Sequence, residues 1–123
     1  MVNIGDTFLI DALGSHLFII ISDPQQDPEN IVLANFTSWE SRKDQSCIVE
    51  ATEHPFLSHK SCIYYRERRT LSIKQFEASV KIGAIIPKEA VSPELLNRIH
   101  KGASVSPFLP LNSKKILEDQ GLI

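Results

Sequence analysis

The sequence has no long apolar run. Its longest uninterrupted apolar stretch, Leu17 to Ile21, is five residues, whereas a helix needs about 20 apolar residues to cross a bilayer. Residues 1–6 lack the basic region and the apolar core of a signal peptide. We therefore expect a cytoplasmic protein that has no membrane partner.

Cysteine is also scarce, and the two cysteines, Cys47 and Cys62, lack the paired spacing that forms a metal knuckle. Both lie in strand-like segments, which predicts buried free thiols. His54 and His59, with the acidic residues near them, match no standard metal motif. A Walker loop, a dinucleotide-binding glycine signature and a serine-nucleophile motif are absent too. We therefore expect no metal site and no cofactor.

The sequence lacks an overall positive charge. Its 13 basic and 15 acidic residues give a formal net charge of −2, so a nucleic-acid partner would need a local basic patch. The one concentrated patch is Arg66, Arg68 and Arg69, and in an extended chain Arg69 faces the side opposite the other two. Such a face suits a phosphodiester backbone, with Tyr64 stacking on a base. It equally suits an edge strand whose charges prevent aggregation.

The rest of the composition is that of a globular domain, with 42% apolar and 23% charged residues among 123. Short β-rich segments lie between glycine, proline and polar turns. They predict strands at residues 6–10, 16–22, 31–36, 47–49 and 61–65. Residues 73–77 and 80–86 fit either a last hairpin or the start of a helical turn.

A helix is predicted over residues 93–101. Ser92 is a good N-cap, Pro93 suits the first helical position, and Gly102 follows a basic last turn. The apolar residues of this helix have helical spacing and should pack on the sheet.

These elements predict a mainly β fold with a C-terminal helix, a small half-open β-barrel over residues 1–105. Residues 106–123 form a tail, in which Asn112 is expected to cap a short helix over 113–120. The tail either packs back on the barrel, crosses a dimer, or folds only on a partner.

Five segments, in the same order along the chain, resemble the PemK/MazF (Kid-like) toxin family. They are a glycine-aspartate opening strand, a central strand ending in serine, a strand that delivers a catalytic threonine or serine, a serine-started strand followed by an arginine-threonine pair, and a closing glycine strand before a helix. Here they are residues 5–10, 18–22, 31–38, 61–71 and 82–86. Where the family has arginine and proline before the central strand, this divergent chain has His16 and Leu17.

The resemblance implies an SH3-like barrel that forms a homodimer. It implies the toxin of a toxin–antitoxin system, an endoribonuclease that cleaves single-stranded RNA and is neutralised by a cognate antitoxin. The family's reaction needs no metal, since the ribose 2′-hydroxyl attacks the adjacent phosphate. The products carry 2′,3′-cyclic phosphate and 5′-hydroxyl ends.

Candidate catalytic residues follow from that chemistry. It needs a base for the 2′-hydroxyl, an acid for the departing 5′-oxygen, and groups that stabilise charge on the phosphate. Histidine exchanges protons most readily near neutral pH. We expect His16 to act as acid or base and Thr37 to contact the phosphate. His59 is expected to be the second proton-transfer group or a phosphate contact.

The candidate RNA-binding residues are Ser38, Trp39, Tyr64, Arg66, Arg68 and Arg69. Structural interpretations stay open beside the functional ones: His16 also fits a turn residue that satisfies a carbonyl, and Trp39 fits the edge of a core. We expect His54 to be structural, and His100 to complement the dipole at a helix end.

Three other functions fit the same sequence. A barrel without catalysis would be a binding module, which the missing family arginine favours. A second is a toxin acting on a protein target such as gyrase: the related CcdB proteins end in tryptophan-glycine-isoleucine, and this chain ends Gly121-Leu122-Ile123. A third is a structural or regulatory protein whose arginine-rich strand binds an acidic peptide.

Overall fold

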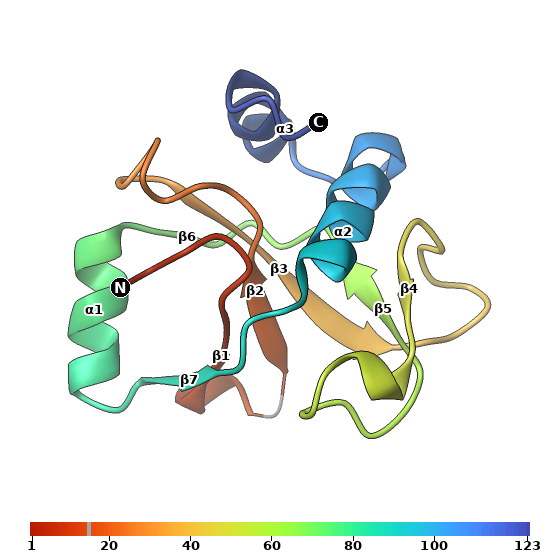
Figure 1. Cartoon of the computed structure of the whole chain (residues 1–123), viewed down its shortest axis with the longest axis horizontal. Helices are drawn as coiled ribbons and strands as arrows, with labels where there is room; N and C mark the ends of the chain where they lie inside the picture. Colours follow the sequence, from red (N-terminus) through yellow and green to blue (C-terminus); the bar gives the residue numbers. More distant parts are fainter. Residues whose placement is uncertain (15) are drawn as a thin grey trace.

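An antiparallel β-sheet organises the chain (Figure 1). The computed structural model describes residues 1–14 and 16–123, and within them the sheet has seven strands in the order β4-β5-β3-β2-β1-β7, with β6 paired to β3 off this path. The strands are β1 (Thr7–Ile10), β2 (Leu17–Ile20), β3 (Ile31–Ser38), β4 (Ile48–Val49), β5 (Ser61–Tyr64), β6 (Thr70–Leu71) and β7 (Ile85–Lys88). The helices are α1 (Ile73–Lys81), α2 (Pro93–Val105) and α3 (Leu111–Asp119), with short 3-10 helices η1 (Asp11–Leu13) and η2 (Ala51–Glu53). The expected mainly β fold is confirmed at this level.

The long strand β3 has different partners at its two ends. Its first residues, Ile31 and Val32, pair with β6, whereas its last four, Asn35 to Ser38, pair with β5. On its other side, β3 pairs with β2. The chain between β5 and β6 therefore starts and ends beside the same strand.

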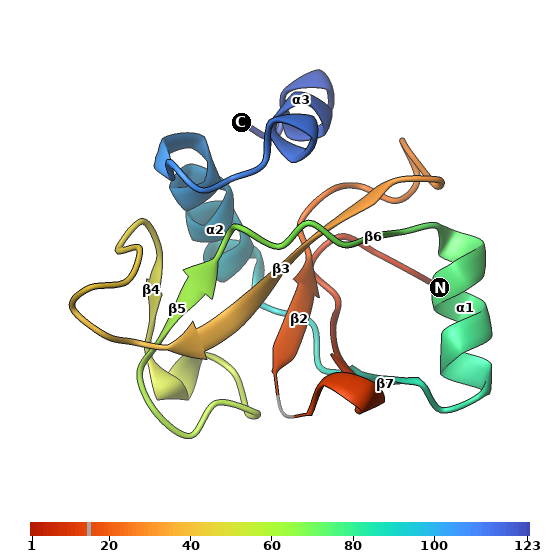
Figure 2. The ribbon, with the colours of Figure 1, turned by 180° about the vertical axis from the view of Figure 1, so that it is seen from behind.

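Two apolar cores lie on opposite faces of β2 and β3, because successive side chains of a strand alternate between faces. One face packs against α2 and α3, and its members include Leu17, Ile19, Val32, Ala34, Phe36, Leu95, Ile99 and Leu117. The other packs against α1, and its members include Phe8, Phe18, Ile20, Ile31, Leu33 and Phe76. In Figure 2, α1 lies at the right of the sheet, α2 lies toward the left, and α3 lies above them.

The segment after β6 is helical. Residues 73–81 form α1, so the helical alternative is correct and the hairpin is wrong. The cause is a capping box: Ser72 Oγ accepts from the Gln75 N–H at 3.1 Å, and the Gln75 side chain accepts from the Ser72 N–H at 2.9 Å. Phe76 then anchors the helix in the core. The last strand, β7, pairs with β1.

Helix α2 begins where the sequence predicts, because Ser92 Oγ accepts from the Leu95 N–H at 3.1 Å. It continues to Val105, so the predicted end at residue 101 is wrong and Gly102 lies inside the helix. His100 is therefore not at a helix end. It is buried, its Nε2 donates to the Ile21 carbonyl at 2.8 Å, and burial lowers its pKa.

The tail packs back on the sheet. Helix α3 starts at Leu111 after Pro110, so Asn112 is not its cap. Leu117 of this helix lies in the same core as Leu95 of α2. The Gln120 side chain accepts from the Asp23 N–H at 2.7 Å, which ties the end of α3 to the loop after β2.

The cysteine prediction is confirmed, since Cys47 and Cys62 are both buried and free. Cys62 lies in β5 and Cys47 directly before β4. Burial raises the pKa of both thiols. Among the described residues, no helix has the length and apolar character needed to span a membrane.

Candidate functional site

Three hollows meet at Thr37, near the end of β3. The arginine groove, about 680 Å³, is lined by Leu13, His16, Phe18, Asn35, Thr37, Tyr64 and residues 66–69. The tyrosine pocket, about 260 Å³, is lined by Thr37, residues 42–44, residues 62–66 and Phe108. The histidine hollow, about 290 Å³, is lined by His16, Leu17, residues 36–38, residues 56–59 and Ser61.

The floor of the arginine groove is a row of side chains across three strands. Phe18 of β2 pairs with Asn35 of β3, and Asn35 pairs with Tyr64 of β5. Directly paired residues of antiparallel strands face the same side of the sheet, and Thr37, two residues after Asn35, faces it too. The side chain of Tyr64 remains 42% exposed. The groove therefore has an aromatic and polar floor, with one ring accessible for stacking.

The basic side of the groove comes from the chain between β5 and β6. Residues 66–69 are a turn and an irregular segment, not a strand. The buried carboxylate of Glu67 accepts from the Arg69 guanidinium at 2.8 Å and from the Arg69 N–H at 2.9 Å. Arg69 therefore lines the same groove as Arg66 and Arg68. The prediction that Arg69 faces the opposite side is wrong, because it assumed an extended chain.

The arginine groove keeps a net positive charge. Glu67 offsets the charge of Arg69, while Arg66 and Arg68 are exposed. The Arg66 guanidinium also lies 4.6 Å from the centre of the Phe108 ring, a cation–π contact that positions it between the groove and the tyrosine pocket. Within residues 1–14 and 16–123, Arg66 and Arg68 form no ion pair, so two of the three predicted arginines present their charge to a ligand.

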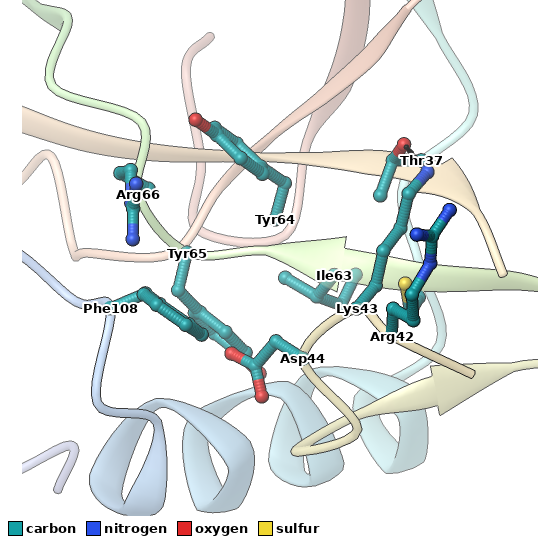
Figure 3. Close-up of a pocket in the computed structure, with 10 residues that line it drawn as sticks. Thr37, Arg42, Lys43, Asp44, Ile63, Tyr64, Tyr65, Arg66 and Phe108 are labelled. Carbon is teal, nitrogen blue, oxygen red and sulfur yellow. Dashed lines mark hydrogen bonds between the residues drawn. The ribbon is translucent and has the colours of Figure 1, made fainter. Parts of the chain in front are cut away.

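Lys43 joins the site although no sequence pattern indicates it. Its Nζ donates to Thr37 Oγ1 at 2.9 Å and to the Ser38 carbonyl at 2.8 Å, and lies 3.7 Å from the Glu40 carboxylate. Figure 3 shows the side chain reaching Thr37. Because Thr37 Oγ1 accepts this bond, its own O–H can donate to a ligand. The contact exists only because the loop after β3 folds back.

The tyrosine pocket has an apolar inner part. Tyr65 is buried, its hydroxyl donates to the Ile99 carbonyl at 2.7 Å, and burial raises its pKa, so the phenol stays protonated. Phe108 comes from the chain between α2 and α3 (Figure 3). The tail, which lies outside the family resemblance, therefore contributes to this site.

The histidine hollow holds the second group of predicted residues. Ser38 faces the side of β3 opposite to Thr37, and its Oγ lies 2.7 Å from His59 Nε2. The Ser58 Oγ lies 3.1 Å from the other ring nitrogen of His59. His16 lines both this hollow and the arginine groove. The fold thus places His16 and Thr37 between the arginines on one side and the Ser38–His59 pair on the other.

Trp39 lines none of the three hollows. Its indole N–H donates to Gln45 Oε1 at 2.8 Å, and the Lys60 ammonium lies 4.3 Å from the ring centre. The prediction that Trp39 contacts RNA stays a prediction. His54 is buried, and its Nε2 donates to the Glu89 carbonyl at 2.6 Å, which joins the loop before β5 to the chain after β7.

Residues 1–14 and 16–123 contain no cluster of three or more histidine, cysteine, aspartate or glutamate side chains arranged to hold a metal ion. No protein-family model, curated protein or solved structure matches this chain. Function is therefore inferred from the geometry of the three hollows.

Proposed function

We propose that this chain is a metal-independent endoribonuclease that cleaves single-stranded RNA, a divergent toxin of the PemK/MazF type with an SH3-like half-open barrel. One observation carries the proposal: a single groove is lined by a histidine, a threonine hydroxyl, an exposed tyrosine ring and a basic segment. These are His16, Thr37, Tyr64, Arg66, Arg68 and Arg69, which come from three separate parts of the chain.

An unpaired RNA strand suits the arginine groove. Arg66 and Arg68 supply local positive charge in a chain whose formal net charge is −2, so phosphates would be attracted to this surface and not to the molecule as a whole. Tyr64 offers a ring on which a base can stack. Bases inside a duplex are already stacked and paired, so such a ring favours single strands.

The two histidines supply the proton transfers, because His16 and His59 border the same hollow. One removes the proton of the ribose 2′-hydroxyl, whose oxygen attacks the adjacent phosphorus. The bond from phosphorus to the 5′-oxygen breaks, and the other histidine gives that oxygen a proton. Thr37, held by Lys43 at 2.9 Å, donates to the phosphate as negative charge builds there.

The test is incubation of the purified chain with a long single-stranded RNA in excess EDTA, followed by mapping of the product ends. We expect discrete cuts with 5′-hydroxyl ends and a loss of at least about 100-fold in rate for His16→Ala. Asn97→Ala, at an exposed position of α2 outside the three hollows, serves as the control and should cleave at the wild-type rate. Intact RNA with the folded wild-type chain would refute the proposal, and equal cutting by His16→Ala would remove His16 from the mechanism.

Binding has its own test. Arg68→Gln should weaken RNA binding and reduce its salt dependence, whereas Lys74→Gln, an exposed charge change on α1, should leave both unchanged. A homodimer and a cognate antitoxin are further parts of the proposal. Light scattering of the purified chain tests the first, and rescue of growth by a small reading frame encoded beside this one tests the second.

A non-catalytic RNA-binding module is the second candidate. Two observations favour it. His16 occupies the family's arginine position, and Glu67 forms an ion pair with Arg69 that offsets its charge. It predicts binding of single-stranded RNA to the arginine groove without any cleavage. If the chain neither binds nor cuts RNA, a protein target such as gyrase becomes the leading alternative.

A further inference from the structure

Asn35 is a polar residue in the floor of the arginine groove, and the proposed mechanism gives it no role. It is only 8% exposed, and in the part of the chain that the structure describes its Oδ1 is buried without a hydrogen-bond partner. Its neighbours in the register are Phe18 on β2 and Tyr64 on β5, and neither ring supplies an N–H donor. The hydroxyl of Thr37, the next residue on this face of β3, accepts from Lys43, and within residues 1–14 and 16–123 its O–H makes no hydrogen bond to Asn35.

An unbonded buried carbonyl oxygen is uncommon, because buried polar groups are almost always hydrogen-bonded and an unmet one lowers stability. An apolar residue would fill this position without that cost. Asn35 lines the groove, but its Oδ1 is itself covered, so a ligand supplies the missing N–H donor when the exposed neighbouring side chain of Tyr64 moves to receive it. The position is therefore suited to a ligand contact more than to stability.

We propose that Asn35 reads the edge of a nucleobase that stacks on Tyr64, and that the preferred base is adenine. This rests on the proposed function as far as RNA is the ligand. An asparagine amide is complementary to adenine, whose N6 amino group donates to Oδ1 while its ring N7 accepts from Nδ2. Since Tyr64 and Asn35 are directly paired, their side chains are neighbours, and a base on the ring of Tyr64 brings its edge to the amide.

A base fits these features better than an acidic peptide. Arg66 and Arg68, from the same wall of the groove, can hold the phosphates on either side of a stacked base. An acidic peptide would bind the arginines, but it would leave the exposed Tyr64 ring and the Asn35 amide without a specific partner. Peptide binding is retained as one outcome of the test.

The probes are hexamers of 2′-O-methyl adenosine, cytidine, guanosine and uridine, which cannot undergo 2′-hydroxyl attack. Their binding to the full chain is measured by fluorescence anisotropy, so the result does not depend on catalysis. We expect the adenosine hexamer to bind roughly 5- to 150-fold more tightly than the uridine hexamer. A hexamer in which purine riboside replaces adenosine lacks the N6 amino group but keeps N7, so the wild type should bind it more weakly than the adenosine hexamer.

The variant is Asn35→Leu, which keeps the number and branching of the side-chain heavy atoms and removes the amide. It should bind all four hexamers equally and no longer distinguish adenosine from purine riboside. It should also unfold at the same or a higher temperature than the wild type, because it removes an unbonded buried oxygen. Asn97→Leu, at an exposed position of α2, is the matched control and should keep the base preference.

The outcomes separate this inference from the proposed function. An adenosine preference that disappears in folded Asn35→Leu supports the inference, whether or not the wild type cleaves RNA. An unchanged preference in Asn35→Leu, no preference in the wild type, or binding of an acidic peptide in place of every hexamer would overturn it. Cleavage with no role for Asn35 would leave the proposed function standing alone.

Discussion

Gly102 gives a prediction in which tertiary structure reverses what helix propensity implies. In an isolated helix, replacing glycine by alanine is favourable by about 1 kcal/mol. A Cβ placed on Gly102, however, would lie 2.3 Å from the Tyr65 hydroxyl oxygen, 2.9 Å from Cys47 Cβ and 2.9 Å from the Ser46 carbonyl oxygen. Gly102→Ala therefore forces α2 away from β5 and the loop before β4.

The magnitude follows from three terms. Overpacking a well-filled site costs about 1–3 kcal/mol, and displacement of Tyr65 costs roughly 1 kcal/mol for its hydrogen bond to the Ile99 carbonyl. Against these stands the propensity gain of about 1 kcal/mol. We expect a net loss of about 1–3 kcal/mol in the free energy of unfolding. For a chain of this length, each 1 kcal/mol lowers Tm by about 4 °C, so the predicted fall is about 4–12 °C.

Thermal and urea unfolding followed by circular dichroism measure this loss. Asn97→Ala, at an exposed position of the same helix, is the control and should leave Tm unchanged or slightly higher. The double variant with Tyr65→Phe removes the nearest of the three contacting atoms, so its loss should be smaller than the sum of the two single losses. A Gly102→Ala protein at least as stable as the wild type would refute the packing of α2 described above.

Three further predictions concern titration, burial and the site. Burial holds the pKa of His100 below its ordinary value of 6.5, so the unfolded chain binds the proton more readily and stability should fall as pH drops from about 7 to about 5. Urea titrations should show that His100→Gln removes this slope; an identical slope would place the responsible group elsewhere. Cys47 and Cys62 should react with iodoacetamide at least about tenfold more slowly in the native chain than in urea, measured by mass spectrometry, and rapid native labelling would contradict their burial. Thr37→Val and Lys43→Met should each lower RNA cleavage by about tenfold, and the double variant should lose little more; fully additive losses would argue against a shared role.

Much of the secondary structure is encoded in short stretches of the sequence. The apolar run of residues 16–22 indicates a strand buried on both faces, and β2 is such a strand. The start of α2 is encoded by Ser92 and Pro93, whose capping geometry depends on adjacent residues alone. The capping box of Ser72 and Gln75 was equally readable, and it would have decided for α1 over the hairpin.

The candidate site was only partly predictable. Asn35 left a signal, a polar residue within the apolar run of β3, whereas Lys43 left none. Gly102 has the residue type of a helix terminator and so predicts too early an end for α2, whereas its close packing against Tyr65 explains a glycine inside the helix. His100 was assigned to a helix end for the same reason.

By itself, the sequence determined the central strands and the start of α2, because hydrophobic period and capping act over a few neighbouring residues. Which side chains meet was decided only by the tertiary structure. The pairing of β3 with β2 and β5 sends Thr37 to the arginine groove and Ser38 to His59. Because strand side chains alternate, a shift of one residue in that register would exchange the two faces. The site therefore depends on pairings between segments far apart in the chain, which no local pattern specifies.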